Sequence, residues 1–198
     1  MSGKAVFLGL GKALVEGTSH AREGPPLVRP ATRAIPLLCN AGFELVVVAH
    51  EPRAALGTLS EEDISRQGRR LEKAIARLDA TLSGFYYCPH HPSGSIPKYA
   101  VDCVCRRPQP GLIIHAASDL GIDLSASWVV GDLLDDVEAG RRAGCRTVLV
   151  DTGSETEWRV SRYRVPHYLT GDLAKAARLI LAAERKSAAG PRMGRQAS

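Results

Sequence analysis

Short apolar runs alternate with longer amphipathic stretches along most of this chain. The runs are five to eight residues long and rich in β-branched or aromatic residues, which is typical of strands buried in a parallel sheet. They occupy residues 4–9, 43–50, 84–88, 127–132 and 147–151, and a sixth short apolar segment opens the stretch 168–185. This pattern predicts strands at regular intervals along the chain.

The stretches between these runs repeat their apolar positions with helical spacing. Helices are expected over residues 29–42, 60–82, 111–120, 134–143 and the later part of 168–185. Gly42 is typical of a position that ends a helix. Ser60 and Asp63 resemble a capping box, and Leu59 with Ile64 would form the accompanying hydrophobic staple.

Alternating strands and helices predict an α/β fold, Rossmann-like, with a doubly wound parallel sheet, helices on both faces and no large cap domain. Functional groups of such folds gather beyond the carboxyl ends of the strands. Here those ends are residues 9–12, 49–52 and 131–136 and the long loop that follows Cys88. We therefore expect the function of the chain to reside on the rim that they form.

Composition and charge describe an ordinary globular protein, with 44% hydrophobic and 24% charged residues. Four of the basic residues lie in the last 14 positions, which contain no acid, and without them the net charge of +5 falls to +1. We expect one domain over residues 1–185 and a disordered basic tail over 186–198. The near-neutral body argues against a nucleic-acid partner.

A membrane association is also not expected, because no apolar run reaches the length of a membrane span. The apolar stretch near the start is interrupted by Lys12 and lacks a cleavage site, so we expect no signal peptide and a cytoplasmic protein. The odd number of cysteines, five, favours metal binding in a reducing compartment over a disulfide framework.

The loop 88–109 contains two paired motifs of potential metal ligands. Cys88 and His90 form one pair, and Cys103 and Cys105 form the other. Three thiolates and one imidazole match a closed tetrahedral zinc site, which would be structural because it leaves no position for water. Two alternatives remain open at this point: His91 could replace His90, or the thiols could be ordinary surface residues.

Three segments together resemble one family. "FYYCPHHPSGS", "CVCRRPQPG" and "WVVGDLLDDVEAG" are similar to the D,D-heptose 1,7-bisphosphate phosphatases of the haloacid dehalogenase (HAD) superfamily, which include histidinol-phosphatase relatives. The likeness extends from about residue 5 to 182. It implies a zinc-clamped loop and a magnesium-dependent phosphatase site that removes the 7-phosphate of a heptose bisphosphate used for lipopolysaccharide or surface-layer sugars.

The chain departs from this family at the end of the first strand. The family has Asp-x-Asp-Gly-Thr there, in which the first Asp attacks phosphorus and binds magnesium while the second is the general acid and base. Aligned on Phe7 and Leu8, this sequence places Gly9 and Gly11 at those two positions, and Lys12 follows. Because glycine has no side chain, no nucleophile is encoded at this strand end.

Other rim residues match the family in part. Ala49, His50 and Glu51 stand where the family has Thr-Asn-Gln, so a phosphate-binding hydroxyl is missing. Asp132 matches the magnesium-binding Asp, and its acidic neighbour would be Asp135 or Asp136. These acids could form a residual magnesium site, or they could simply be favourable at a helix N-terminus.

Arg106 and Arg107 match a basic pair that contacts the phosphate and sugar of the substrate in the family. They could keep that role, remain in solvent, or pair with Glu51. With Lys12 they would form an anion pocket.

Three functions follow from these observations. The first, which we favour, is a non-catalytic relative that binds a phosphosugar or a protein partner of a surface-polysaccharide pathway. The second is an active magnesium-dependent phosphatase that uses displaced groups, with His50 as a substitute nucleophile. The third is a zinc-stabilised interaction module that binds no small molecule.

Overall fold

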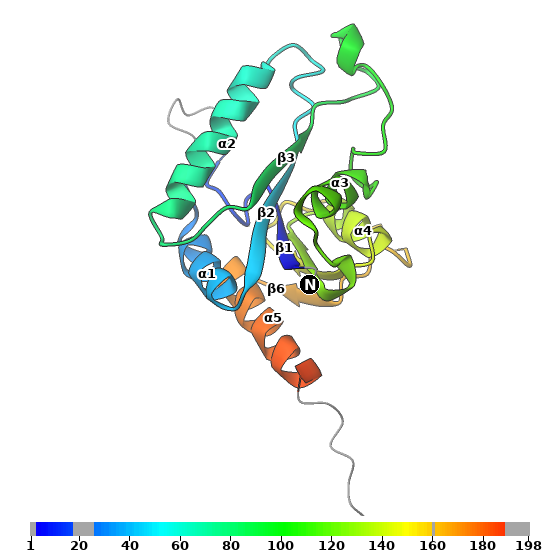
Figure 1. Cartoon of the computed structure of the whole chain (residues 1–198). Helices are drawn as coiled ribbons and strands as arrows, with labels where there is room; N and C mark the ends of the chain where they lie inside the picture. Colours follow the sequence, from blue (N-terminus) through cyan, green and yellow to red (C-terminus); the bar gives the residue numbers. More distant parts are fainter. Residues whose placement is uncertain (1–2, 18–25, 160, 189–198) are drawn as a thin grey trace, which may run out of the picture.

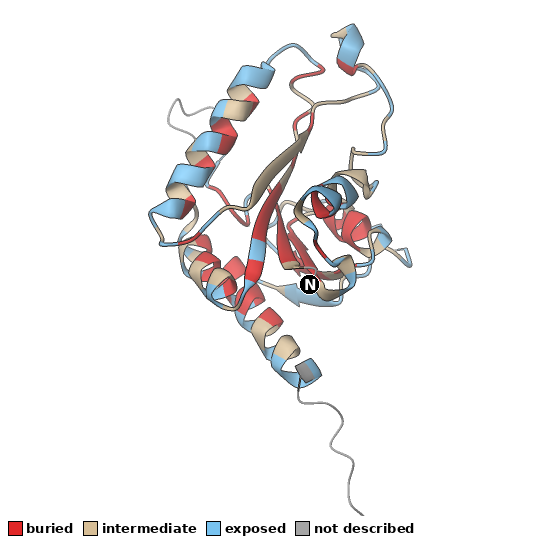
Figure 2. Ribbon diagram, in the orientation of Figure 1, coloured by how far each residue is buried: buried red, intermediate tan, exposed pale blue. Residues whose placement is uncertain are grey.

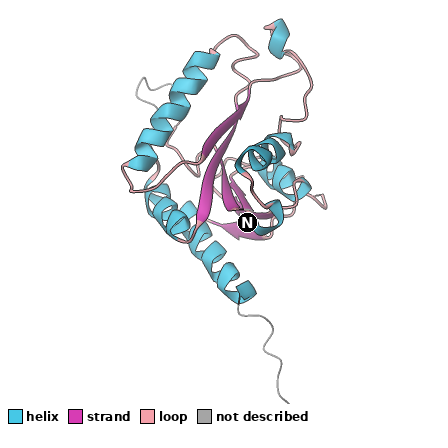
Figure 3. Cartoon of the chain, viewed as in Figure 1, coloured by secondary structure: helices cyan, strands magenta, loops and turns pink. Residues whose placement is uncertain are grey.

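The computed structural model describes residues 3–17, 26–159 and 161–188 of the chain. Within them, six parallel strands form one sheet in the order β3-β2-β1-β4-β5-β6 (Figures 1 and 3). The strands are β1 (Lys4–Gly9), β2 (Phe43–His50), β3 (Gly84–Cys88), β4 (Trp128–Gly131), β5 (Arg146–Val150) and β6 (Tyr168–Thr170). Strands β2 and β3 lie on one side of β1 and strands β4, β5 and β6 lie on the other, so the strand order reverses at β1. Ligands of such sheets bind at this switch point.

Helices cover both faces of the sheet, as the alternating pattern predicts (Figure 1). The α-helices of the described part are α1 (Arg29–Asn40), α2 (Glu61–Ala76), α3 (Gly111–Leu120), α4 (Leu134–Arg142) and α5 (Leu173–Ala188), and short 3-10 turns occur at Pro97–Tyr99 and Leu124–Ala126. Residues of α1, α2 and α5 pack in the core layer on one face, and those of α3 and α4 pack on the other.

The strand β1 lies at the centre of both core layers. Val6 and Leu8 face the layer beneath α1 and α5, whereas Ala5 and Phe7 face the layer beneath α3 and α4. All four side chains are buried, as is most of the central sheet (Figure 2). The alternation explains why this strand is apolar from Ala5 to Leu8, and it places the residues that follow Gly9 at the rim.

The expected strands and helices are confirmed, with one clear difference in α2. This helix ends at Ala76 and not near residue 82, and Asp79 adopts a left-handed backbone with φ of 54°. The apolar spacing continues past the helix because Leu78 and Leu82 still pack against the core from the linker. The predicted end of the helix was therefore wrong, although Leu78 and Leu82 beyond it are packed inward.

Two further features bear on the sequence expectations. The helix α5 runs to Ala188, so Lys186 is helical, and residues 189–198 of the expected tail lie outside the described residues. In the described ranges, no helix has both the length and the apolar character needed to cross a bilayer.

The start of α2 yields a testable prediction. The Ser60 hydroxyl accepts a hydrogen bond from the Asp63 backbone N–H at 3.1 Å, and the Asp63 carboxylate accepts one from the Ser60 N–H at 3.2 Å. Ser60→Ala should lower the free energy of unfolding by about 0.5–2 kcal/mol, measured by urea denaturation. Ser60→Asn, which keeps an acceptor, should stay close to the parent, and an unchanged Ser60→Ala variant would contradict the capping role.

Candidate functional site at the carboxyl ends of the strands

A cavity of about 410 Å³ opens at the carboxyl ends of β1, β2 and β4. Its volume is typical of sites for small molecules. Lys12 lies on one wall, His50 and Glu51 lie on the wall that follows β2, and Arg107 and Asp132 also line it. The structure thus brings together three of the strand ends that the sequence singles out.

Asp132, directly after β4, is held by three hydrogen-bond donors. Its Oδ2 accepts from the backbone N–H of Lys12 at 2.9 Å, the hydroxyl of Thr152 at 3.1 Å and the hydroxyl of Ser154 at 2.8 Å. The residue is only 4% exposed. A methyl group built at Gly11 would overlap Oδ1 of Asp132 and lie 2.9 Å from its Cγ. The Asp132 carboxylate therefore occupies the space that a side chain at position 11 would need.

Asp136, in the first turn of α4, is buried beside Gly9. Its Oδ1 accepts a hydrogen bond from Nη1 of Arg107 at 2.6 Å, and the same contact is an ion pair between the two side chains. Its Oδ2 is buried and has no hydrogen-bond partner in the described part of the chain. Burial raises the pKa of Asp136, while the nearby Arg107 opposes this effect, and Asp136 in turn raises the pKa of Arg107.

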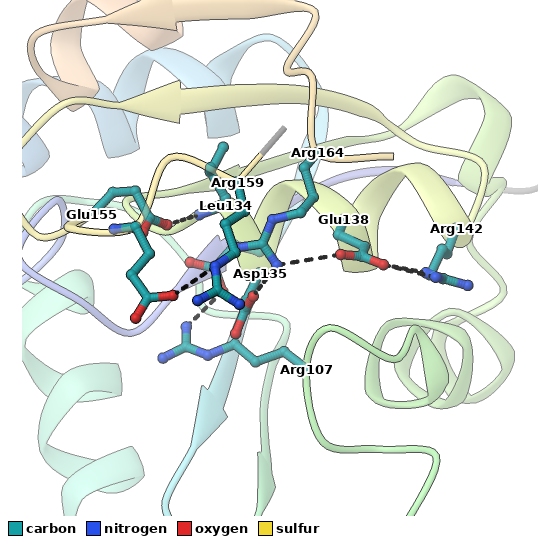
Figure 4. A network of polar contacts seen from close by, with 10 residues as sticks. Arg107, Leu134, Asp135, Glu138, Arg142, Glu155, Arg159 and Arg164 are labelled. Carbon is teal, nitrogen blue, oxygen red and sulfur yellow. Dashed lines mark hydrogen bonds and ion pairs between the residues drawn. The ribbon is translucent and has the colours of Figure 1, made fainter. Parts of the chain in front are cut away.

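A network of ion pairs fixes α4 against the segment that follows β5 (Figure 4). Arg164 contacts the carboxylates of Asp135 at 2.8 Å and Glu138 at 3.4 Å. The Glu155 carboxylate accepts a hydrogen bond from the backbone N–H of Leu134 at 2.7 Å, so it caps the start of the helix. Glu155 and Arg164, from the segment after β5, therefore complete the rim on this side.

Sequence reasoning missed Thr152, Ser154 and Glu155 as rim residues. The available signal was their position, because these polar residues come directly after the apolar strand β5 and so reach the same sheet edge as Asp132. Their contacts with Asp132 and α4 bridge about twenty positions in sequence, which no local pattern reveals.

The three predicted anion-binding residues do not all reach the cavity. Lys12 and Arg107 line it, whereas half-buried Arg106 is not among its lining residues. Glu51 pairs with Arg53 at 2.7 Å, so the pairing of Glu51 with Arg106 or Arg107 is not what the structure contains. Arg107 is engaged with Asp136 instead.

His50 lies at the end of β2 between the cavity and the loop that follows β3. Its Nε2 lies 3.2 Å from the backbone carbonyl of His90, which only accepts, so Nε2 carries the proton and donates it. Burial lowers the pKa of His50, and Arg107 acts in the same direction. The imidazole is therefore neutral at physiological pH, with one nitrogen occupied by a backbone group.

Cys88, His90, Cys103 and Cys105 form one compact cluster, whose donor atoms all lie within 4.8 Å of one another. The sulfur–sulfur distances are 3.1 to 3.5 Å, and Nδ1 of His90 lies 3.4 Å from Sγ of Cys105. These distances are slightly shorter than the edges of about 3.7 Å expected for a tetrahedron around a metal bound by sulfur. The cluster could therefore hold a metal ion.

The neighbouring His91 has a different role. Its Nδ1 accepts a hydrogen bond from the backbone N–H of Ser93 at 3.2 Å, so His90 and not His91 joins the cluster. Burial raises the pKa of the Cys88 thiol. A bound cation would offset that effect and hold the thiolate that metal binding requires.

The rim does not fit the magnesium ion that the family resemblance implies. Magnesium prefers near-octahedral oxygen coordination and usually takes carboxylates, waters and a phosphate. Here Gly9 and Gly11 supply no side-chain ligand atom, and the Arg107 guanidinium lies on Asp136. Within the described ranges, the rim acids do not form a group of three ligands with metal-binding spacing.

The contact between Gly11 and Asp132 yields a second prediction. Gly11→Ala should displace the Asp132 carboxylate from its three donors and lower the free energy of unfolding by about 1–3 kcal/mol. Gly171→Ala is the matched control, because a methyl group there meets only the end of Lys175 at 3.7 Å. Urea denaturation of both variants measures the difference, and equal stability would refute the overlap.

Comparisons with known proteins agree with this architecture. A family model described as HAD-hydrolase-like matches residues 104–176. D-glycero-beta-D-manno-heptose-1,7-bisphosphate 7-phosphatase of Salmonella typhi is 42% identical over 117 residues, which are 59% of this chain and 62% of that protein, so the match spans about three fifths of this relative.

Two further comparisons cover more of each chain. The structure of D,D-heptose 1,7-bisphosphate phosphatase from B. bronchiseptica, complexed with magnesium and phosphate, is 22% identical, covers 91% of this chain and 99% of that one, and shares the fold with a TM-score of 0.72. D-glycero-D-manno-heptose-1,7-bisphosphate 7-phosphatase of Chlorobaculum tepidum is 33% identical and matches 79% of this chain and 81% of that protein. The chain therefore belongs to the family of D-glycero-D-manno-heptose-1,7-bisphosphate 7-phosphatases within the HAD superfamily.

Proposed function

We propose that this chain binds a phosphorylated sugar at the rim without hydrolysing it. One observation carries the proposal: both positions after β1 at which the family has catalytic aspartates are glycine, and the Asp132 carboxylate fills the space beside Gly11. The family's named activity belongs to the relatives, and for this chain it supplies the chemical class of the ligand.

The remaining groups of the rim are poor substitutes for the missing nucleophile. Ser154 places a hydroxyl at the cavity, but it donates its hydrogen bond to Asp132, whose charge is already stabilised by two other donors. The Nε2 of His50 donates to a backbone carbonyl. Removing a covalent nucleophile from a hydrolase costs roughly 10⁶-fold in turnover, so binding without reaction is the expected outcome.

The polar groups of the cavity suit a phosphosugar. Lys12 and Arg107 provide cationic donors for phosphate oxygens. Glu51, Asp132 and Gln67 provide acceptors for sugar hydroxyls on the same surface. A site of donors alone would suit any anion, whereas this mixture favours a ligand with both a phosphate and hydroxyl groups.

We also propose that the cluster of Cys88, His90, Cys103 and Cys105 holds a structural zinc ion. Three sulfurs and one nitrogen are the donor set that zinc prefers, and four protein ligands leave no position for a reacting water. The ion would offset the conformational entropy lost when the loop after β3 is ordered.

An activity and binding experiment tests the main proposal. The purified, zinc-loaded chain is incubated with D-glycero-β-D-manno-heptose 1,7-bisphosphate and magnesium, and we expect no phosphate release above background. The same ligand should raise the melting temperature, because saturation at a hundred times Kd stabilises the folded state by about 2.7 kcal/mol. Lys12→Ala should reduce that shift, since it removes an exposed cationic donor.

Two outcomes would contradict this proposal. Phosphate release at an enzymatic rate, lost in Ser154→Ala, would favour a phosphatase with a displaced nucleophile. A melting temperature that does not change at saturating ligand would favour an interaction module that binds another protein and no phosphosugar.

Metal analysis tests the zinc assignment. The purified chain should contain one zinc ion per chain, and Cys103→Ser should lose it together with part of the roughly 10–16 kcal/mol that structural zinc supplies in small peptides. Cys39→Ser is the matched control, because Cys39 lies outside the cluster and contacts the Thr81 carbonyl. Equal zinc content in the two variants would overturn the assignment.

A further inference from the structure

Two buried carboxylates lie at the junction of β4 and α4. Asp132 and Asp136 are 4% and 5% exposed, respectively. A buried carboxylate is stable only when opposite charge or several hydrogen bonds replace the water that it has lost. The junction therefore requires compensating groups, whatever ligand occupies the cavity.

The chain supplies these groups from its own residues. Three neutral donors surround Oδ2 of Asp132, namely one backbone N–H and two hydroxyls. The guanidinium of Arg107 lies 2.6 Å from Oδ1 of Asp136. Arginine stays charged at all physiological pH values, so this compensation is permanent.

The same guanidinium also faces the ligand cavity. Arg107 lines the cavity of about 410 Å³, and its side chain is 24% exposed. A guanidinium carries five N–H donors, and Asp136 receives a single hydrogen bond from it. The remaining donors include groups that can contact a phosphate oxygen.

A divalent cation would compete with this arrangement. Its approach to Asp136 would bring two positive charges together at one carboxylate, which is unfavourable in a buried site. Gly9 lies close to the Asp136 carboxylate and offers no side chain, and a Cβ there would lie 3.1 Å from Oδ2 of Asp136. The geometry opposes the exchange of the guanidinium for a metal ion.

We infer that Arg107 is the resident cation of the rim and that the site takes its phosphate ligand without a divalent metal. Phosphate binding without a metal rests on the proposed function, whereas the replacement of the metal by Arg107 does not.

Manganese, which is paramagnetic and has the coordination preferences of magnesium, tests the replacement directly. The zinc-loaded chain, free of ligand and chelator, is titrated with Mn²⁺ to millimolar concentration and followed by electron paramagnetic resonance. We expect no bound Mn²⁺. Saturable binding that is lost in Asp136→Asn would overturn the inference.

A variant pair tests the role of the guanidinium itself. Arg107→Met keeps an unbranched stem but removes the charge, so it should gain saturable Mn²⁺ binding and a melting temperature that rises with Mn²⁺. Arg106→Met is the matched control and should bind no Mn²⁺. If Arg107→Met does not fold, the titration of the unmodified chain still decides the matter.

Binding of inorganic phosphate, measured by calorimetry in metal-depleted buffer with and without added magnesium, separates the two claims. Equal affinity in both buffers is the expected result. Binding that needs magnesium would overturn this inference and leave phosphate binding intact. No binding in either buffer would overturn metal-free phosphate binding and the proposed function together, while an absence of bound Mn²⁺ would still support the replacement.

Discussion

A carboxylate removed from water must be neutralised, and this requirement connects the parts of the rim. Asp136 obtains its counter-charge from Arg107, which follows Cys105 of the cluster of Cys88, His90, Cys103 and Cys105 by two residues. The cluster that brings Cys88 and Cys105 together therefore also lies beside the segment that delivers the guanidinium to α4. Loss of order in that loop would leave Asp136 buried and uncompensated, so the loop and the rim depend on each other.

The acids at the start of α4 have a second source of compensation on the opposite side. Arg164 contacts Asp135 and Glu138, and Glu155 caps the helix at Leu134 (Figure 4). The helix is thus held between one cation from the loop after β3 and another from the segment after β5. Leu133, which lines the cavity, directly precedes this helix, so the network orders part of the rim before any ligand binds, which lowers the entropy lost on binding.

The sequence predicts the framework of this protein better than its contacts. The strand at residues 43–50 is predicted to the residue, because its run of valines has no helical alternative of that length. The end of α2 is misplaced because Leu78 and Leu82 continue the apolar spacing beyond the helix. The pair Arg107–Asp136 could not be foreseen, since its members are 29 positions apart and each has other plausible partners. Only the fold decides between them.

If this rim binds no divalent metal, as we propose, charge balance explains why two aspartates and a metal ion would be absent together. A rim with carboxylates at positions 9 and 11 holds two more negative charges than this one, and a divalent cation balances them. A rim without both carboxylates and the cation has the same net charge, and Arg107 then compensates the remaining Asp136, whereas losing either alone would create an uncompensated charge beside two buried carboxylates. The position of Asp132 then opposes reversal, because its carboxylate occupies the space beside Gly11 and is held there by donors from Lys12, Thr152 and Ser154. A carboxylate returned to position 11 would have to displace Asp132 from those donors before it could face any substrate.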